Sequence, residues 1–149
     1  MKTALATVLI AFACLSASAF AFRSGDEKTL TDKQLTSIRE SIISNLKDEC
    51  CDIRTSTLQL VIELRQAYPT LDLDYAIIPI MNVLKSDDVP GLRILAACAL
   101  NCFDSDMGRY AVTRRALYDS NDRVAHHCAA LMRSWIVKAL PEGIAENAW

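Results

Sequence analysis

The sequence predicts an all-helical fold made of repeated helix pairs, and three observations lead to this prediction. The 149 residues include only four glycines and four prolines, the residues that most often interrupt helices. Apolar residues recur every three or four positions along most of the chain, which is the spacing of one helix face. No run alternates between apolar and polar residues from one tight turn to the next, so no strand is expected.

The composition excludes several classes of protein. Because 52% of the residues are hydrophobic and 23% are charged, an intrinsically disordered chain is not expected. Six cysteines in 149 residues are too sparse for a small domain held together by disulfides. The formal net charge of −2 creates no field that attracts nucleic acid. The length fits one domain.

Residues 1–21 have the pattern of a secretory signal peptide. Lys2 precedes an apolar run, and small residues follow this run in two A-x-A patterns. We expect cleavage after Ala21, which leaves 128 residues in the periplasm or outside the cell, with no membrane contact. An uncut membrane anchor is the alternative, but the apolar run is short for a span of about 20 residues. A lipoprotein signal at Cys14 is disfavoured, because bulky Phe12 stands where such signals usually have a small residue.

Helices are expected from residue 30 to 139, after a polar lead-in at 22–29. Thr31 and Gln34 have the spacing of a capping box at the start of the first helix. Its apolar stripe consists of Leu35, Ile38, Ile42, Ile43 and Leu46. A second helix begins at 53 and carries apolar residues as far as Leu64.

After a longer connection, a third helix is expected at 75–84. Pro79 lies inside this helix and should bend it, because its nitrogen cannot donate a hydrogen bond to the carbonyl four residues before. Pro90 suits the first turn of the fourth helix, which ends near Phe103.

Two further helices complete the chain. Residues 104–106 cap the fifth helix, which ends near Leu117, and Ser120 or Asn121 caps the sixth. The sixth helix stops close to a proline and a glycine, so residues 140–149 are expected to form a tail.

The chain repeats itself three times along these helices. In each unit a helix ends on leucine, an acidic turn follows, and the next helix opens on a branched apolar residue. These opening residues are Ile53, Leu92 and Val124, which lie 39 and 32 residues apart. Small residues recur four positions later, at Thr57, Ala96 and Cys128. One helix pair cannot bury its apolar face alone, so stacked pairs are expected to form one core.

Two of these segments resemble the HEAT-repeat family. Residues 92–100 look like the second helix of a HEAT repeat, and residues 76–80, with their proline, look like the first. The resemblance implies an all-α fold, a short right-handed α-solenoid of about three HEAT-like repeats. The segments 20–22, 25–26 and 30–32 are also similar to the start of small exported bacterial HEAT-repeat proteins of uncharacterised function.

The resemblance also implies a role for arginines of the second helices, which in this family often bind acidic groups of the preceding turn. Arg54 and Arg93 match that position, each six residues after an aspartate of the turn. The third unit has Ala125 there, and Arg123 is the candidate to replace the missing arginine.

The repeat register assigns two faces to the second helices. The expected core residues are Ile53, Thr57, Leu60, Leu92, Ala96, Leu100, Val124, Cys128 and Leu131. The opposite, concave side is expected to bind a protein or peptide, as solenoids bind extended partners. Its candidate partner-binding residues are Ser56, Gln59, Glu63, Leu95, Cys98, Asn101, Cys102, His127 and Arg133. The alternative for each of these residues is a solvated face without a ligand.

Five cysteines follow the leader, and this odd number leaves at least one thiol without an intramolecular partner. They are Cys50, Cys51, Cys98, Cys102 and Cys128. Cys98 and Cys102 lie one helical turn apart, and His127 is expected beside them on the next helix. These three side chains could hold one metal ion with an open coordination position. The competing interpretation is two small residues on a helix and a surface histidine.

No catalytic or cofactor motif is present: the sequence has no Gly-rich phosphate loop, nucleophile elbow or H-E-x-x-H. We therefore expect an exported protein-interaction or scaffold module that is not an enzyme and needs no cofactor. A metal- or thiol-dependent binding protein is the alternative. A lyase-like or chaperone-like use of the solenoid would rest on analogy of fold alone.

Overall fold

The computed structural model describes residues 31–139, and every regular element in this part of the chain is helical. The elements are α2 (Asp32–Asn45), α3 (Cys51–Ala67), the 3-10 turn η1 (Asp74–Ala76), α4 (Ile77–Ser86), α5 (Pro90–Asn101), α6 (Asp106–Tyr118) and α7 (Asp122–Ala139). The all-helical prediction is confirmed. The predicted leader, lead-in and tail lie outside the described residues. Within these residues, no helix combines the length and apolar character needed to cross a membrane.

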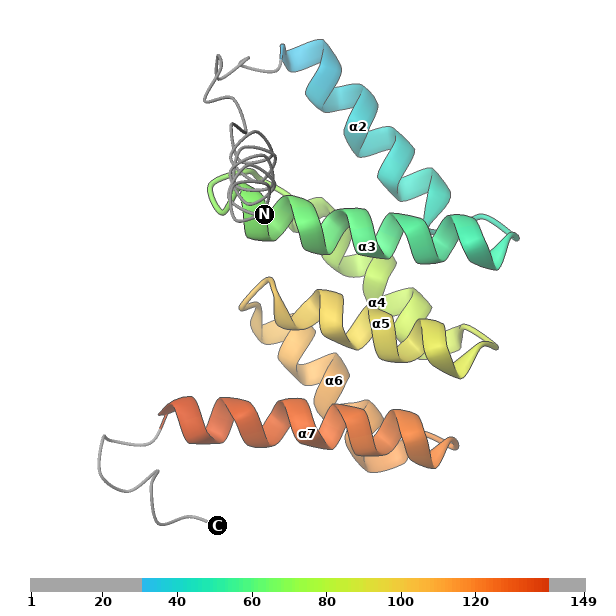
Figure 1. Ribbon diagram of the computed structural model, residues 1–149, viewed down its shortest axis with the longest axis vertical. Coiled ribbons are helices and arrows are strands. Elements are labelled where there is room, and N and C mark those ends of the chain that lie inside the picture. The colour runs from blue at the N-terminus through green and yellow to red at the C-terminus, as the bar shows by residue number, and fades with distance from the viewer. Residues whose placement is uncertain (1–30, 140–149) are drawn as a thin grey trace, which may run out of the picture. The chain divides into compact units, whose positions relative to one another are not determined.

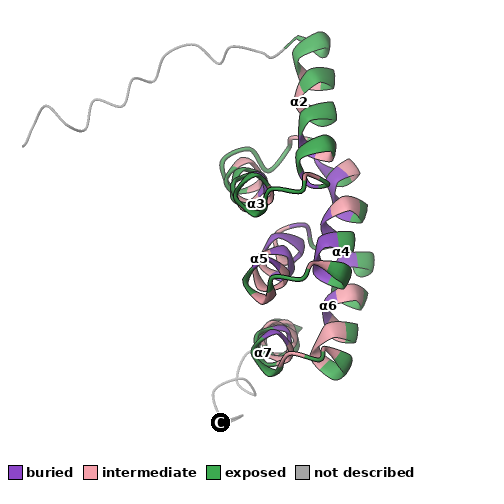
Figure 2. Cartoon of the chain, turned by 90° about the vertical axis from the view of Figure 1, so that its right-hand side faces the viewer, coloured by how far each residue is buried: buried purple, intermediate pink, exposed green. Residues whose placement is uncertain are grey.

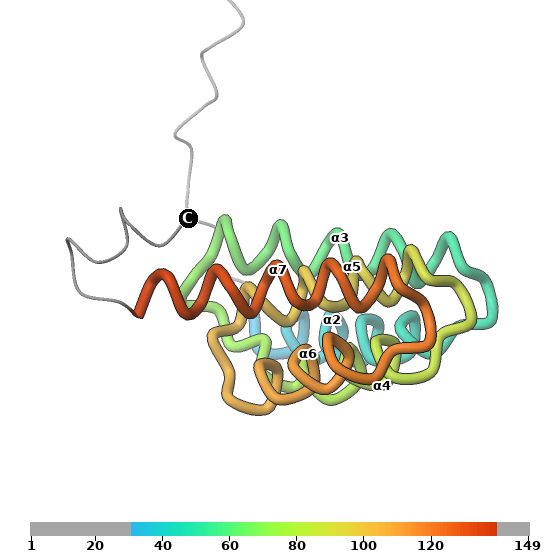
Figure 3. The backbone as a smooth tube through the Cα atoms, turned by 90° about the horizontal axis from the view of Figure 1, so that it is seen from below, coloured from blue at the N-terminus to red at the C-terminus, as the bar shows by residue number. Residues whose placement is uncertain are grey.

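The described helices form two layers. One layer contains α3, α5 and α7 side by side, and the other contains α2, α4 and α6 (Figures 1 and 2). Figure 3 looks along the stack and shows α3, α5 and α7 overlying one another on one side and α2, α4 and α6 on the other. Direct packing joins α3 to α5, α5 to α7, and α4 to α6. The central helix α5 therefore has a packed neighbour on both flanks.

Local signals start several helices where the sequence predicts. Pro90 is the first residue of α5, where its missing N–H has no helical partner to lose. The side chain of Ser105 accepts a hydrogen bond from the Gly108 N–H at the start of α6. The Asn121 side chain accepts from two backbone N–H groups at the start of α7, at 3.1 and 3.3 Å. These bonds satisfy N–H groups that have no acceptor within the helix.

The third predicted helix begins differently. Its first residues form the 3-10 turn η1, and the α-helix starts only at Ile77. Pro79 is thus the third residue of α4, within the first turn, where backbone N–H groups have no intrahelical acceptor. Pro79 consequently marks the beginning of α4 and not a bend in its middle.

The core is centred on α5. Five of its residues are buried, namely Leu92, Ala96, Ala97, Ala99 and Leu100. Small side chains on this helix allow its neighbours to approach closely, and larger ones from α3, α4, α6 and α7 fill the space around them. The largest fully buried side chains outside α5 include Leu58, Ile80, Val112 and Val124.

Two predicted core residues are wrong. Thr57, Leu92, Ala96, Leu100, Val124 and Cys128 are buried, and Leu131 packs against the core. Ile53 and Leu60, however, are 38% and 44% exposed. One repeat later, their equivalents Leu92 and Ala99 are 3% and 0% exposed, because α3 covers that flank of α5. In the described part of the chain α3 is the first helix of its layer, so the same flank of α3 is open.

The longer connection between α3 and η1 is held by an arginine that the sequence did not single out. Arg65 donates hydrogen bonds to the carbonyls of Pro69 and Leu71, at 3.1 and 3.3 Å. Its Nε also donates to the carbonyl of Cys102 at the end of α5, at 3.4 Å. This one side chain therefore joins the connection to the next helix of the layer.

Candidate functional site

The turns that precede α3, α5 and α7 share one hydrogen-bonded design. In each turn an aspartate side chain accepts from the backbone N–H two residues later. Asp48, Asp87 and Asp119 are these aspartates, and the distances are 2.8, 2.9 and 2.9 Å. The repeated acidic residues therefore shape the turns, as such local bonds commonly do.

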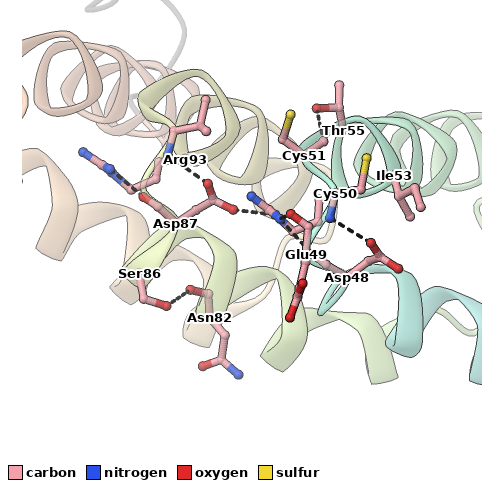
Figure 4. A network of polar contacts seen from close by, with 12 residues as sticks. Asp48, Glu49, Cys50, Cys51, Ile53, Thr55, Asn82, Ser86, Asp87 and Arg93 are labelled. Atoms are coloured by element: carbon pink, nitrogen blue, oxygen red, sulfur yellow. Dashed lines mark hydrogen bonds and ion pairs between the residues drawn. The ribbon is translucent and has the colours of Figure 1, made fainter.

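Two arginines link these turns into a ladder, seen around Asp87 in Figure 4. Arg54 donates to the carbonyls of Asp48 and Glu49 in its own turn, and its Nε donates to the Asp87 carboxylate at 2.7 Å. Arg93 repeats this pattern: it donates to the Asp87 carbonyl at 2.7 Å and to the Asp119 carboxylate at 2.9 Å. Each arginine thus binds main-chain oxygens of its own turn and the acidic side chain of the next turn.

The ladder ends at the third turn. Arg123 is exposed, and its side chain forms no hydrogen bond or ion pair within residues 31–139, so it does not replace the arginine missing at Ala125. Arg115 of α6 instead lies 3.6 Å from the second oxygen of Asp119. Burial raises the pKa of Asp119, but hydrogen bonds from Arg93 and the Asn121 N–H outweigh this effect and lower the pKa below its ordinary value. Because these acidic groups are paired or hydrogen-bonded, their role is to hold the turns together.

The candidate partner-binding residues divide into two groups. Five are exposed: Ser56, Gln59, Glu63, His127 and Arg133. Four are partly buried: Leu95, Cys98, Asn101 and Cys102. Eight of them lie on α3, α5 or α7, and Cys102 directly follows the last residue of α5.

Several candidates already have partners within the chain. The Asn101 side-chain oxygen accepts from the Trp135 indole N–H at 2.6 Å, and Leu95 packs against the core. The Cys102 thiol donates to the Cys98 carbonyl at 3.4 Å, and the Ser56 hydroxyl donates to the Asp52 carbonyl at 2.8 Å.

Asn101 and Arg133 belong to the flank of their helices and not to the predicted binding face. The bond to Trp135 of α7 shows that Asn101 faces α7. Arg133 lies 32 residues later, which is the offset between the second and third repeats. It therefore occupies the corresponding flank of α7, which points away from α5. The sequence register contained this relation, but without a structure the direction of the next helix was unknown.

The remaining candidates line up across the layer. Ser56, Leu95 and His127 occupy equivalent positions of the three repeats, and Gln59 and Cys98 occupy equivalent positions of the first two. We call Ser56, Gln59, Glu63, Leu95, Cys98, Cys102 and His127 the outer face. Gln59, Glu63 and His127 are exposed, and their side chains have no hydrogen bond or ion pair within residues 31–139. On the outer face, α3 and α7 thus carry polar side chains that have no such bonds within the described residues. The partly buried apolar and thiol groups of this face lie on α5 and directly after it.

The alternative of a metal site at Cys98, Cys102 and His127 is not supported by the structure. Within residues 31–139, no three His, Cys, Asp or Glu side chains lie close enough to hold a metal ion, so Cys98, Cys102 and His127 do not form a site. Burial raises the pKa of the thiols of both Cys98 and Cys102, whereas a metal ligand must be the thiolate.

The cysteines differ strongly in accessibility. Cys50 and Cys51 are exposed at the start of α3, and Cys128 is fully buried. Burial raises the pKa of the Cys128 thiol to about 11, so little of the reactive thiolate forms at neutral pH.

We expect a thiol-specific maleimide to label Cys50 and Cys51 rapidly in the folded protein and Cys128 only after unfolding. Peptide mass spectrometry after timed labelling would measure each rate. Denatured protein is the control, because all five thiols should then react alike. Equal rates for Cys51 and Cys128 in the folded protein would contradict the packing of α7.

The sequence also missed an exposed apolar surface on α6. Tyr110, Leu117 and Tyr118 are 62–68% exposed, and the Arg114 guanidinium lies 5.0 Å from the Tyr118 ring centre. Apolar residues on both sides of this helix were the available signal, but helical spacing alone does not tell which side packs on a neighbour.

Comparisons with protein-family models, with curated proteins and with solved structures find no match for this chain.

Proposed function

We propose that the chain is an exported interaction module, built as a short right-handed α-solenoid of three HEAT-like repeats, that binds a segment of another protein on its outer face. The HEAT-like assignment is supported by the recurrence of one aspartate turn before α3, α5 and α7. The arginine ladder, which repeats once along the same edge, supports it further.

Export to the periplasm or the outside is part of the proposal. Its support is the signal-peptide pattern of residues 1–21. The proposed module is not an enzyme and needs no cofactor. The support for this is that Asp48, Asp87 and Asp119 each bind a backbone N–H of the turn, and that Asp87 and Asp119 also bind arginines.

One observation carries the proposed function: Gln59, Glu63 and His127 are exposed and free of intramolecular side-chain bonds, although all three lie on helices that are otherwise tied together by such bonds. A peptide that crosses α3, α5 and α7 would place polar groups against the two outer helices and an apolar side chain near Leu95. Glu63 is the acidic residue of this face, so a basic group of the partner is expected beside it.

The test compares two double variants that change the same residue types on the same two helices. Gln59→Ala with His127→Ala removes outer-face groups, whereas Gln66→Ala with His126→Ala removes exposed groups outside it. Immobilised wild type, variant and control would each be incubated with a cell-envelope fraction, and retained proteins would be quantified by mass spectrometry.

We expect the wild type and the control to retain the same protein and the outer-face variant to lose most of it. Equal retention by all three would overturn the outer face as the binding site. Melting curves of the three proteins would establish that they are equally folded.

A further inference from the structure

Within residues 31–139, no helix covers the outward flanks at the two ends of the layer formed by α3, α5 and α7. At the first end, Ile53 and Leu60 lie on one flank of α3. The equivalent flank of α5 is the one that α3 covers. At the other end, the α7 flank with Arg133 corresponds to the α5 flank that α7 covers. Repeat stacks normally end in polar surfaces, but Ile53 and Leu60 are exposed on α3 and Ile136 is 58% exposed near the end of α7.

Residue spacing makes each flank a continuous stripe. On α3, the exposed residues Ile53, Ser56, Leu60, Glu63 and Ala67 follow one another at intervals of three and four. On α7, the same intervals connect Ala129, Arg133 and Ile136. We call these the α3 stripe and the α7 stripe. Such spacing places residues along one side of a helix, as in the seams between packed helices.

The two stripes have opposite charge. Glu63 is the charged residue of the α3 stripe, and Arg133 is the charged residue of the α7 stripe. The segments of the chain around the two stripes differ in charge in the same direction. Residues 31–75 contain eight acidic and five basic residues, whereas 104–139 contain four acidic and six basic residues. Opposite charges favour contact between the two ends and disfavour contact between two identical ends.

We propose that a second copy of this chain docks its α3 stripe on the α7 stripe, so that the stack continues from one molecule into the next. In the parallel arrangement by which α3 packs on α5, Glu63 and Arg133 stand at nearly equivalent helix positions, six residues after Thr57 and five after Cys128. The contact brings Leu60 near the small Ala129 and pairs Glu63 with Arg133.

The contact between copies is weaker than the contacts within one chain, because the arginine ladder does not cross it. Position 125 is alanine, so no arginine reaches the Asp48 turn of the following molecule. Association is therefore expected to depend on protein concentration and to weaken as added salt screens the charge pair. Each copy has both stripes, so the contact is heterologous and can join more than two copies.

This inference goes beyond the proposed function, although the α3 stripe shares Ser56 and Glu63 with the outer face. Its test needs no other protein and does not use the outer-face variant at Gln59 and His127. Sedimentation velocity over a dilution series would measure the average mass of the protein in the form that the cell produces, with its N-terminus read by mass spectrometry. The average mass of the wild type is expected to rise as the protein concentration increases. Glu63→Arg and Arg133→Glu should each weaken association at least tenfold, because each places like charges against each other.

Restoring opposite charges provides the decisive comparison. An equal mixture of the Glu63→Arg and Arg133→Glu proteins, and a single chain with both substitutions, should again associate. Glu40→Arg on α2 and Arg114→Glu on α6 are the matched controls: both residues are exposed and lie on neither stripe, so association should persist.

Two results would overturn the proposal. One is a wild type that stays monomeric at every concentration, which would assign the α3 stripe to another segment of the same chain or to a different protein. The other is association that the single substitutions leave unchanged or that the mixture fails to restore. Circular dichroism and melting temperature would verify the fold of each variant.

Discussion

Replacing Leu100 with alanine is expected to lower the free energy of unfolding by about 2–5 kcal/mol. Leu100 is 2% exposed and lies on α5, the central helix of the core. The neighbouring helix α6 approaches it at Gly108, where a Cβ atom would stand 3.5 Å from the Leu100 Cβ. Because glycine has no side chain to move into the space, the cavity left by the substitution would remain open. Urea unfolding followed by circular dichroism would measure the loss.

A leucine of the same size at the surface provides the control. Leu117 on α6 is 62% exposed, so Leu117→Ala should change the free energy of unfolding by about 0.5 kcal/mol or less. If both substitutions cost the same, Leu100 would not occupy the core and the repeat register around it would have to be revised.

Replacing Asp119 with alanine is expected to cost on the order of 3 kcal/mol at neutral pH. The Asp119 side chain is 1% exposed and binds Arg93, whose side chain is 12% exposed. The substitution leaves this arginine without its carboxylate and also removes the acceptor for the Asn121 N–H. Asp104 is the control: it also pairs with an arginine, Arg109, but its side chain is 82% exposed, so Asp104→Ala should have little effect.

The same carboxylate predicts how stability depends on pH. The pKa of Asp119 is lower in the folded protein than its ordinary value, so the folded state favours the ionised form. This contribution is fully present above about pH 4, the pKa range of an unfolded aspartate, and is lost as the pH falls through the lower pKa of the folded state. Between about pH 5 and pH 2, the free energy of unfolding of the wild type should therefore fall more than that of Asp119→Ala. Parallel loss in the two proteins, measured by urea unfolding at each pH, would contradict this assignment.

The helices and turns of this protein could be predicted because local signals specify them. Pro90 and Asn121 act within a few residues of where they stand, so their effect does not depend on the rest of the fold. The small residues at Thr57, Ala96 and Cys128 are buried as expected, because the repeat register places all three toward the other layer. Pro79 was misplaced because the 3-10 turn before it shifts the start of the α-helix.

The flanks of the helices could not be predicted in the same way. Ile53 has the same place in its repeat as buried Leu92, yet it is exposed because α3 has no preceding helix in its layer within residues 31–139. Asn101 was assigned to the binding face, but it faces α7 and binds Trp135. Whether a flank is covered depends on which helix comes next in space, and a repeat register treats all units as equivalent.

The arginines show a similar limit. The resemblance to the HEAT-repeat family implied that Arg54 and Arg93 bind acidic groups of their own turns, but each binds main-chain oxygen of its own turn and the carboxylate of the next turn. The contact that joins successive units, from each guanidinium to the next aspartate, spans 33 residues in one case and 26 in the other. A partner so distant in sequence becomes evident only when the helices are placed side by side.

The layer of α3, α5 and α7 is fastened at both edges. The arginine ladder joins the helices where they begin, while bonds from Arg65 to the Cys102 carbonyl and from Trp135 to Asn101 join them near the other edge. The pitch between equivalent side chains of successive helices is therefore set before any ligand arrives. A ligand that matches this pitch would bind without an entropic penalty for ordering the helices, and a ligand of different pitch could gain little by deforming them.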